Sequence, residues 1–246
     1  MIDNNPWLLL DEYYNMFDVP RLREVFNVLK SHRETYWSVT EKNKFTHLDH
    51  IKQNKKYYDL HEKEIKDIVV DDPNEQKTDV FLIGQQDNPL HSRYKLIGDH
   101  KNIKEVVSGK KYLQKIGTKI INDLNIKDFI IAYDVNYIYS MPNAKISWHY
   151  DSVPTVPDRL LYSENIRCTP SVITVNLNER IDYRSPTQFK YNDYNYKLDY
   201  YKVALLNTSV LHCVDATPNE RLTLRICLYG KPFEEIKEKL INEKTR

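Results

Sequence analysis

The second half of the chain alternates between apolar and polar residues with a period of two, and this pattern constrains the fold more than any other feature. After residue 125, short β-branched and aromatic runs follow one another with turn residues between them. Strands that follow one another without intervening helices form an antiparallel sandwich or barrel, because parallel strands need long helical crossovers. The stretch from Thr118 to Tyr229 also contains no glycine, which excludes P-loop and GxGxxG nucleotide folds from this half.

The expected strands are runs rich in Val, Ile, Tyr, Phe and Thr that are bounded by turn residues. They cover residues 129–133, 136–140, 145–151, 166–177, 200–206, 209–214 and 221–229, with a turn at 142–144 and a closing helix at 233–241.

The first half has a helical texture rich in Lys, Glu, Asp and His. Residues 20–29 carry an apolar stripe with spacing i, i+3, i+4 and i+7, and residues 60–70 and 103–124 predict two further helices. We expect the last of these to be interrupted at Gly109, with Gly117 as a second candidate break. The domain organisation predicted is an α-rich N-terminal extension, 1–124, that packs on a β-rich core, 125–246, with a short C-terminal helix.

Composition excludes several classes of protein. The net charge of +1, from 36 basic and 35 acidic residues, argues against a dedicated nucleic-acid binder. Three cysteines, an odd number with no CxxC pair, are typical of reduced thiols in a cytosolic compartment. The N-terminus lacks a basic region before its short apolar run, and no apolar stretch reaches the ~18 residues of a membrane span. We therefore expect a cytoplasmic protein with no signal peptide or transmembrane segment.

One motif in the β-rich half is a candidate metal site. His149-Tyr150-Asp151 lies on an expected strand, and His212 ends the apolar strand that contains Val210 and Leu211. The side chains of residues 149 and 151 share one face of a strand, because strand side chains alternate. Two histidines and one carboxylate occupy one face of an Fe(II) octahedron and leave three positions open. This spacing favours a metal site over ordinary sheet residues.

The chain also produces His-x-Asp where no site is expected. His47-Leu48-Asp49 lies in a polar segment without a second His and an Arg at useful spacing, so we interpret it as a surface feature. Cys213, beside His212, is interpreted as packing rather than as a nucleophile or ligand, because alternation turns it away from the face of His212.

The expected strand at 221–229 has two unlike faces. Arg221, Thr223 and Arg225 share one face, and apolar residues share the other. The polar face is either an exposed strand surface or the wall of a pocket for an anion. An inward guanidinium would bind a carboxylate through paired charge-assisted hydrogen bonds, and Thr223 would add a hydroxyl donor.

These residues resemble the pattern of the Fe(II)- and 2-oxoglutarate-dependent dioxygenases, which is His-x-Asp, a distal His and then an Arg. Within that superfamily the chain looks most like the branch of aspartyl/asparaginyl β-hydroxylases and proline hydroxylases, over about residues 138–230. The resemblance implies a mainly β fold with flanking helices, whose core is a double-stranded β-helix (jelly-roll, cupin-like). It also implies that His149, Asp151 and His212 ligate iron. Animal β-hydroxylases of this branch lack the carboxylate ligand, whereas Asp151 is present here.

The same resemblance implies the co-substrates and their contacts. Fe(II), 2-oxoglutarate and O2 would serve the hydroxylation of an amino acid, peptide or protein side chain, with release of succinate and CO2. Arg221 would hold the distal carboxylate of 2-oxoglutarate, with Thr223 near it. Arg167 would lie near the C1 carboxylate, although the segment that contains it has Thr169 where the family often has His. Whether Arg225 or Arg167 shares co-substrate binding with Arg221 stays open.

Two alternatives remain beside this reading. The first keeps the chemistry and takes a nucleobase or nucleic acid as substrate. The residues suited to such contacts are basic or aromatic: Lys55, Lys56, Tyr57, Tyr58, Lys110, Lys111 and Tyr112. An ordinary solvated surface is the plainer interpretation of these residues. The second alternative is a cupin-like metal-binding module without turnover. The sequence leaves the substrate, the stereochemistry and the oligomeric state open.

Overall fold

The computed structural model of the chain describes residues 4–31, 80–85, 104–140, 142–143, 146–149, 167–178 and 184–244. This part is mainly β, with helices packed against it. Its strands are β1 (Trp7–Leu9), β2 (Val80–Gln85), β3 (Ile130–Ser140), β4 (Ile146–His149), β5 (Arg167–Asn176), β6 (Arg184–Tyr191), β7 (Tyr194–Tyr200), β8 (Val203–Asn207), β9 (Leu211–Val214) and β10 (Arg221–Gly230). Its helices are α1 (Val19–Ser31), α4 (Lys104–Asp123) and α6 (Phe233–Lys244), with 3-10 turns η1 (Asp11–Met16) and η5 (Lys127–Phe129).

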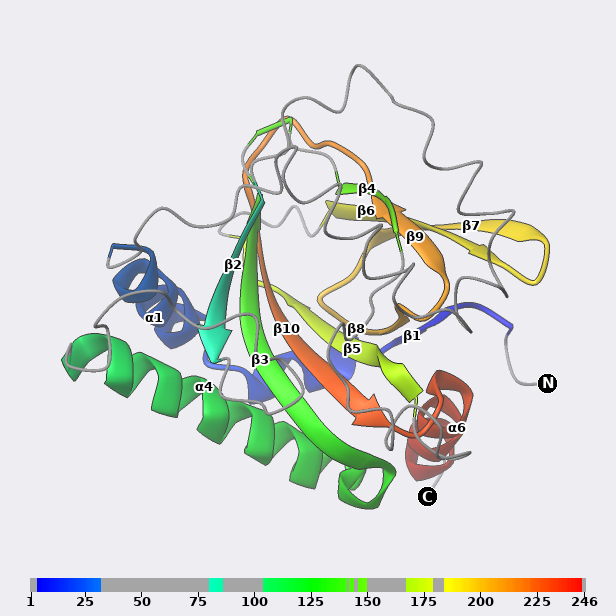
Figure 1. Ribbon diagram of the computed structural model, residues 1–246, viewed down its shortest axis with the longest axis horizontal. Coiled ribbons are helices and arrows are strands. Elements are labelled where there is room, and N and C mark those ends of the chain that lie inside the picture. The colour runs from blue at the N-terminus through cyan, green and yellow to red at the C-terminus, as the bar shows by residue number, and fades with distance from the viewer. Residues whose placement is uncertain are drawn as a thin grey trace.

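The strands form two sheets in which every pairing is antiparallel. The large sheet has six strands in the order β1-β8-β5-β10-β3-β2, and the small sheet has four in the order β4-β9-β6-β7. Figure 1 shows the small sheet on one side of the large sheet, and helices α1 and α4 on the other. The expectation of an antiparallel two-sheet arrangement after residue 125 is confirmed for the described strands. Because β1 and β2 also join the large sheet, the first half of the chain contributes strands as well as helices.

Two features of the sheets differ from the sequence-based expectation. Residues 130–140 form one continuous strand, although Asp134 separates the two apolar runs, because β3 pairs along its length with β10 and, from Val135 to Ser140, also with β2. The hairpin of β6 and β7 was not expected, since both strands are rich in charged and polar residues. Its turn residues Asn192 and Asp193 have φ of 49° and 64°, which is the backbone of a tight primed hairpin turn. An Asn-Asp pair between two aromatic runs is the signal that predicts it.

Helix α4 is continuous through both of its glycines, so the expected interruption at Gly109 or Gly117 is wrong. Gly117 lies instead where α4 approaches β3 most closely. A Cβ atom built on Gly117 would lie 2.5 Å from Cε2 of Tyr133 and 2.6 Å from Cγ2 of Val135. The glycine is therefore a contact residue between helix and sheet. The helix expected at 60–70 and the motif at His47 lie outside the described residues.

Replacing Gly117 with alanine is expected to destabilise the protein by about 1–3 kcal/mol, because the new methyl group overlaps the half-buried Tyr133 and the buried Val135. Gly109→Ala is the matched control in the same helix, since its Cβ would meet Val25 at 3.3 Å and Leu29 at 3.4 Å. There the helical preference of alanine, worth up to ~1 kcal/mol, offsets the tighter contact. Urea unfolding of both variants measures the difference, and equal stabilities would contradict the close approach at Gly117.

The main apolar core lies between the large sheet and its helices. It contains the stripe predicted on α1 and its counterpart on α4, and both pack against one face of the sheet. The residues of this face are Val135, Tyr137, Tyr139, Ile173, Val175, Val203, Leu205, Leu224, Ile226 and Leu228. Full burial of each such side chain contributes about 1.5–3 kcal/mol. This face of the sheet therefore contributes to stability, and the opposite face of the sheet is turned to the small sheet.

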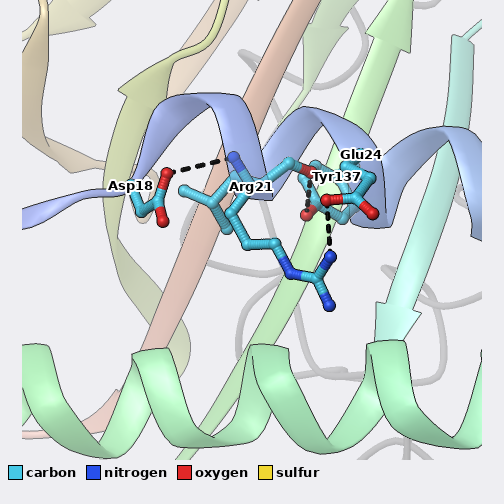
Figure 2. Close-up of polar contacts among 5 residues, drawn as sticks. Asp18, Arg21, Glu24 and Tyr137 are labelled. Carbon is cyan, nitrogen blue, oxygen red and sulfur yellow. Dashed lines mark hydrogen bonds and ion pairs between the residues drawn. The ribbon is translucent and has the colours of Figure 1, made fainter.

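Helix α1 is fixed to the sheet by polar contacts at its first turns (Figure 2). Asp18 precedes the helix, and its Oδ1 accepts a hydrogen bond from the backbone N–H of Arg21 at 3.1 Å, as an N-cap residue does. The buried hydroxyl of Tyr137 on β3 donates to the backbone carbonyl of Leu22 at 2.6 Å. The bond from Tyr137 ties α1 to β3, whereas Asp18 caps the start of the helix.

Tyr137→Phe should destabilise the protein at neutral pH by about 1 kcal/mol, the usual value of one hydrogen bond. Burial raises the pKa of Tyr137, so its hydroxyl stays neutral in the folded protein at a pH where it ionises in the unfolded chain. Folded-state stability is then lost as pH rises above the ordinary tyrosine pKa of ~10. Tyr137→Phe should lose less stability than wild type between pH 7 and pH ~11. Urea unfolding at both values measures this, and identical losses would contradict the expectation.

Candidate functional site

The face of the large sheet that looks toward the small sheet, called here the inter-sheet face, is unusually polar. Its members follow from the register: Arg225 pairs with Thr174, Thr174 pairs with Ala204, and Ala204 packs in a cluster with Phe189 of the small sheet. Strand alternation then places further polar residues on the same face. Its buried polar side chains are Ser140, Thr174, Asn176, Arg221 and Thr223.

The polar face of β10 was expected to be either an exposed strand surface or the wall of a pocket, and the burial of its residues decides between the two. Arg221 is 4% exposed and Thr223 is 5% exposed, while Arg225 is half-buried. An exposed strand surface is excluded for the first two residues, because both side chains are almost fully buried. Burying polar groups is costly unless they are hydrogen-bonded. A buried polar wall between two sheets is therefore typical of a binding site rather than of a packing core.

Arg221 is incompletely satisfied in this position. Its Nη2 donates to Oγ of Ser140 on β3 at 3.2 Å, and its Nη1 is buried without a hydrogen-bond partner among the described residues. Burial lowers the pKa of the Arg221 guanidinium, while Tyr201 and Asp215 act in the opposite direction. Arginine keeps its charge in proteins even so. A buried cation with an unused donor favours a bound anion, which would remove the cost of leaving that charge uncompensated.

His212 faces the same space from the small sheet. It is 5% exposed, and its register partner on β6 is Phe189, whose ring stacks against the imidazole with centroids 6.1 Å apart. Since Phe189 packs toward the large sheet, His212 lies on the inter-sheet side of β9. Its Nδ1 is 2.9 Å from the carbonyl oxygen of Val210. The tautomer that donates this bond carries its lone pair on Nε2, which is the arrangement of a metal-binding histidine.

His149 ends strand β4, directly beside the strand of His212. The Cα of His149 is the register partner of the Cα of His212, so two of the three predicted metal ligands are adjacent in the backbone. The register shifts between Ile146 and His149, where three residue steps on β4 span two on β9. Such a bulge re-aims side chains and is common beside active sites. Asp151 lies outside the described residues, and those residues contain no group of three or more potential metal ligands.

The remaining predicted residues are divided between the two ends of β10. Thr223 lies two residues beyond Arg221 on the inter-sheet face. Arg167 is the register partner of Gly230, at the far end of β10 from Arg221. Nine residue steps of β-strand at ~3.3 Å each separate these positions by about 30 Å. The structure therefore brings Thr223 to Arg221 and does not bring Arg167 there.

Asn176 and Phe189 are site residues that the sequence-based analysis missed. Asn176 is fully buried on the inter-sheet face of β5, and Phe189 packs on His212. The signal for Asn176 is present in the sequence, because Thr174 and Asn176 recur with a period of two inside an apolar strand. Phe189 had no comparable signal, since the strand that carries it was not predicted.

Other residues singled out in the sequence have ordinary surroundings. Cys213 and Cys227 are buried thiols. Tyr112 is half-buried against the helix–sheet core, with the guanidinium of Arg21 5.7 Å from its ring centre. Lys55 to Tyr58 lie outside the described residues. Among the helices that the structure describes, none has both the length and the apolarity needed to cross a membrane.

No family model matches the chain, and no curated protein matches it either. Several solved structures are similar in part. A prolyl-4-hydroxylase of Pseudomonas putida is 17% identical over 50% of this chain and 66% of its own, with a TM-score of 0.32. The viral collagen prolyl hydroxylase of Paramecium Bursaria Chlorella virus-1 is 16% identical over 49% of this chain and 73% of its own, with a TM-score of 0.33.

A protein of Burkholderia pseudomallei described as an oxidoreductase of the 2OG-Fe(II) oxygenase family is 13% identical over 61% of this chain and 68% of its own, with a TM-score of 0.37. The chain thus spans slightly less than two thirds of the Pseudomonas hydroxylase that it matches. In the structure of about half its length, this chain is similar to 2-oxoglutarate- and Fe(II)-dependent oxygenases, prolyl hydroxylases among them.

Proposed function

We propose that this chain is an Fe(II)- and 2-oxoglutarate-dependent oxygenase that hydroxylates an amino acid, peptide or protein side chain and releases succinate and CO2. The observation that carries the proposal is the buried guanidinium of Arg221, whose Nη1 has no partner among the described residues, in the same inter-sheet space as His212. A carboxylate is an anion that a guanidinium binds through two parallel hydrogen bonds.

We further propose that strands β3 to β10 form a double-stranded β-helix. Support comes from the path of the chain. β3, β5, β8 and β10 lie in the large sheet, and β4, β6, β7 and β9 lie in the small one, so the chain passes repeatedly from one sheet to the other. Eight antiparallel strands in two facing sheets are the architecture of jelly rolls and cupins.

His149, Asp151 and His212 are the residues that would hold the iron. Directly opposite residues of an antiparallel pair have Cβ atoms about 4.5–5.5 Å apart, so the register partners His149 and His212 suit a shared ion. Asp151 follows His149 by two residues, the spacing that keeps side chains on one side of an extended strand. When bound, Fe(II) would supply the activation of O2 that no amino-acid side chain provides. Val210 would orient the His212 imidazole through the hydrogen bond at Nδ1.

Arg221 would hold the distal carboxylate of 2-oxoglutarate in this site. Ser140 already accepts a hydrogen bond from Nη2 of Arg221. Nη1 and the remaining N–H groups of the guanidinium are then left for the ligand. Thr223 would add a hydroxyl from the same face. Arg167 is left out of the proposed site, because two positions about 30 Å apart along β-strand cannot hold the two ends of one 2-oxo acid.

Anaerobic addition of Fe(II) and then 2-oxoglutarate tests the proposal directly. We expect a visible metal-to-ligand charge-transfer band that disappears in His149→Ala. The matched control is His47→Ala, which alters the other His-x-Asp of the chain and should keep the band. A flat spectrum of the wild-type protein would overturn the proposal and leave a module without turnover. If the band forms, succinate release measured across amino acids, peptides and nucleotides identifies the substrate class and separates side-chain hydroxylation from nucleobase hydroxylation.

A further inference from the structure

A second unused donor lies near Arg221. The side chain of Asn176, on β5, is fully buried, and its Nδ2 has no hydrogen-bond partner among the described residues. Two buried donors on neighbouring strands, Nη1 of Arg221 and Nδ2 of Asn176, are thus left without acceptors on one face. Buried donors in folded proteins are paired in the great majority of cases, so two together favour a shared ligand.

The register places these two donors within reach of one small anion. The Cα of Asn176 is the partner of the Cα of Thr223, and Arg221 is two residues before Thr223 on the same face of β10. Diagonal neighbours of this kind have Cβ atoms roughly 7–8 Å apart or less. Hydrogen bonds of about 2.9 Å from each side leave room between the donors for the two oxygens of one carboxylate.

The orientation of the Asn176 amide is set by its neighbour. The backbone N–H of Asn178 donates to Oδ1 of Asn176 at 3.1 Å, so the amide cannot be reversed without placing two donors together. Asn178 in turn accepts a hydrogen bond at Oδ1 from the backbone N–H of Leu222 at 2.8 Å. Because Leu222 follows Arg221, Asn178 ties the end of β5 to the strand segment that carries the guanidinium. The backbone N–H of Asn178 therefore orients the Asn176 amide, and the Asn178 side chain holds this segment beside the strand that carries Arg221.

We propose that Asn176 is the second donor of the anion site and that Asn178 is its positioning residue, so that Arg221 and Asn176 together grip the distal carboxylate of the co-substrate. This inference rests on the proposed function and adds two residues to it. One cation and one neutral amide match a singly charged, planar carboxylate. A phosphate, with up to two charges, would be left partly uncompensated in a buried site with these donors.

Binding of two matched 2-oxo acids tests the role of Asn176. 2-Oxoglutarate and 2-oxopentanoate have the same carbon chain, but only the first has a distal carboxylate. Their affinities are measured by calorimetry on the full chain, with Mn(II) present in place of Fe(II) to prevent turnover. We expect Asn176→Ala to weaken 2-oxoglutarate about ten- to a hundredfold, the value of a hydrogen bond to a charged group, and to leave 2-oxopentanoate unchanged.

Further variants separate this role from a structural one. Asn176→Asp keeps the size of the side chain and should weaken 2-oxoglutarate more than Asn176→Ala, because two carboxylates would then face each other. Asn178→Ala keeps the backbone N–H that donates to Oδ1 of Asn176 and removes only the acceptor of the Leu222 N–H, so it should weaken 2-oxoglutarate less than Asn176→Ala does. Ser171→Ala is the matched control, since Ser171 is 4% exposed on the opposite face of the same strand, and it should leave both affinities unchanged.

Four outcomes would overturn the inference. Equal weakening of both acids by Asn176→Ala would show a structural role, and unchanged binding of both would show no role. Wild-type protein that binds neither acid would overturn the proposed function together with this inference. Wild-type protein that prefers 2-oxoglutarate, and loses the preference in Arg221→Met but not in Asn176→Ala, would leave the proposed function standing and overturn the role of Asn176 alone.

Discussion

Arg221→Met is expected to weaken 2-oxoglutarate by at least about thirtyfold while the protein without ligand becomes more stable. Loss of one partner from a buried, hydrogen-bonded charge pair costs about 2–5 kcal/mol, and each 1.4 kcal/mol is a tenfold change in affinity. In the absence of a ligand the substitution should raise the stability of the protein. The reason is that Arg221 is a buried cation that forms no ion pair with a described carboxylate and has an unused donor. A methionine of similar length removes that desolvation cost, which we expect to stabilise the apoprotein by about 1 kcal/mol or more.

Calorimetric titration gives the affinity, and urea unfolding of the protein without ligand gives the stability. Arg225→Met is the matched control, because Arg225 is half-buried on the same face of the same strand. Its loss of affinity should be much smaller, and this comparison decides whether Arg225 shares the co-substrate. Loss of affinity together with a large loss of stability in Arg221→Met would contradict the prediction, since it would identify Arg221 as a structural residue.

His212→Ala is expected to abolish Fe(II) binding, with a loss of at least about a hundredfold in affinity. Removal of a hydrogen-bond partner behind a metal ligand already costs 10–100-fold, so removal of the ligand itself costs more. The control is Cys213→Ala, which alters the adjacent residue of β9. Cys213 is 1% exposed, and alternation directs it to the opposite face of the strand. Cys213→Ala should lower stability modestly and keep the metal.

Anaerobic titration with Fe(II), followed by the charge-transfer band with 2-oxoglutarate, measures both variants. His149→Ala should behave as His212→Ala does, because the two positions are register partners across β4 and β9. Retention of Fe(II) by His212→Ala at wild-type affinity would contradict the proposed metal site. Loss of Fe(II) in Cys213→Ala as well would show that the strand as a whole, rather than the imidazole, had been disturbed.

The period of the sequence predicts the strands well where side-chain type and alternation agree. β5 and β10 were expected almost at their observed bounds, since Val, Ile, Thr and Leu dominate them. β6 and β7 were missed, because their stability comes from pairing with each other and with β9 rather than from apolar content. Gly117 shows the reverse case. Its residue type suggests a helix break, but contact with Tyr133 and Val135 on a distant strand determines its role.

By itself, the sequence determined that β10 has one polar and one apolar face and that His149 and His212 lie on strands, because alternation is a local property of the backbone. Only the tertiary structure decided which face of β10 is turned to the helices and which to the small sheet. Helices α1 and α4 cover the apolar face, so Arg221 and Asn176 are buried against the small sheet. The pairing of His149 with His212 and the two unused donors also depend on contacts between segments far apart in the chain. Such contacts set register and burial, which no local pattern encodes.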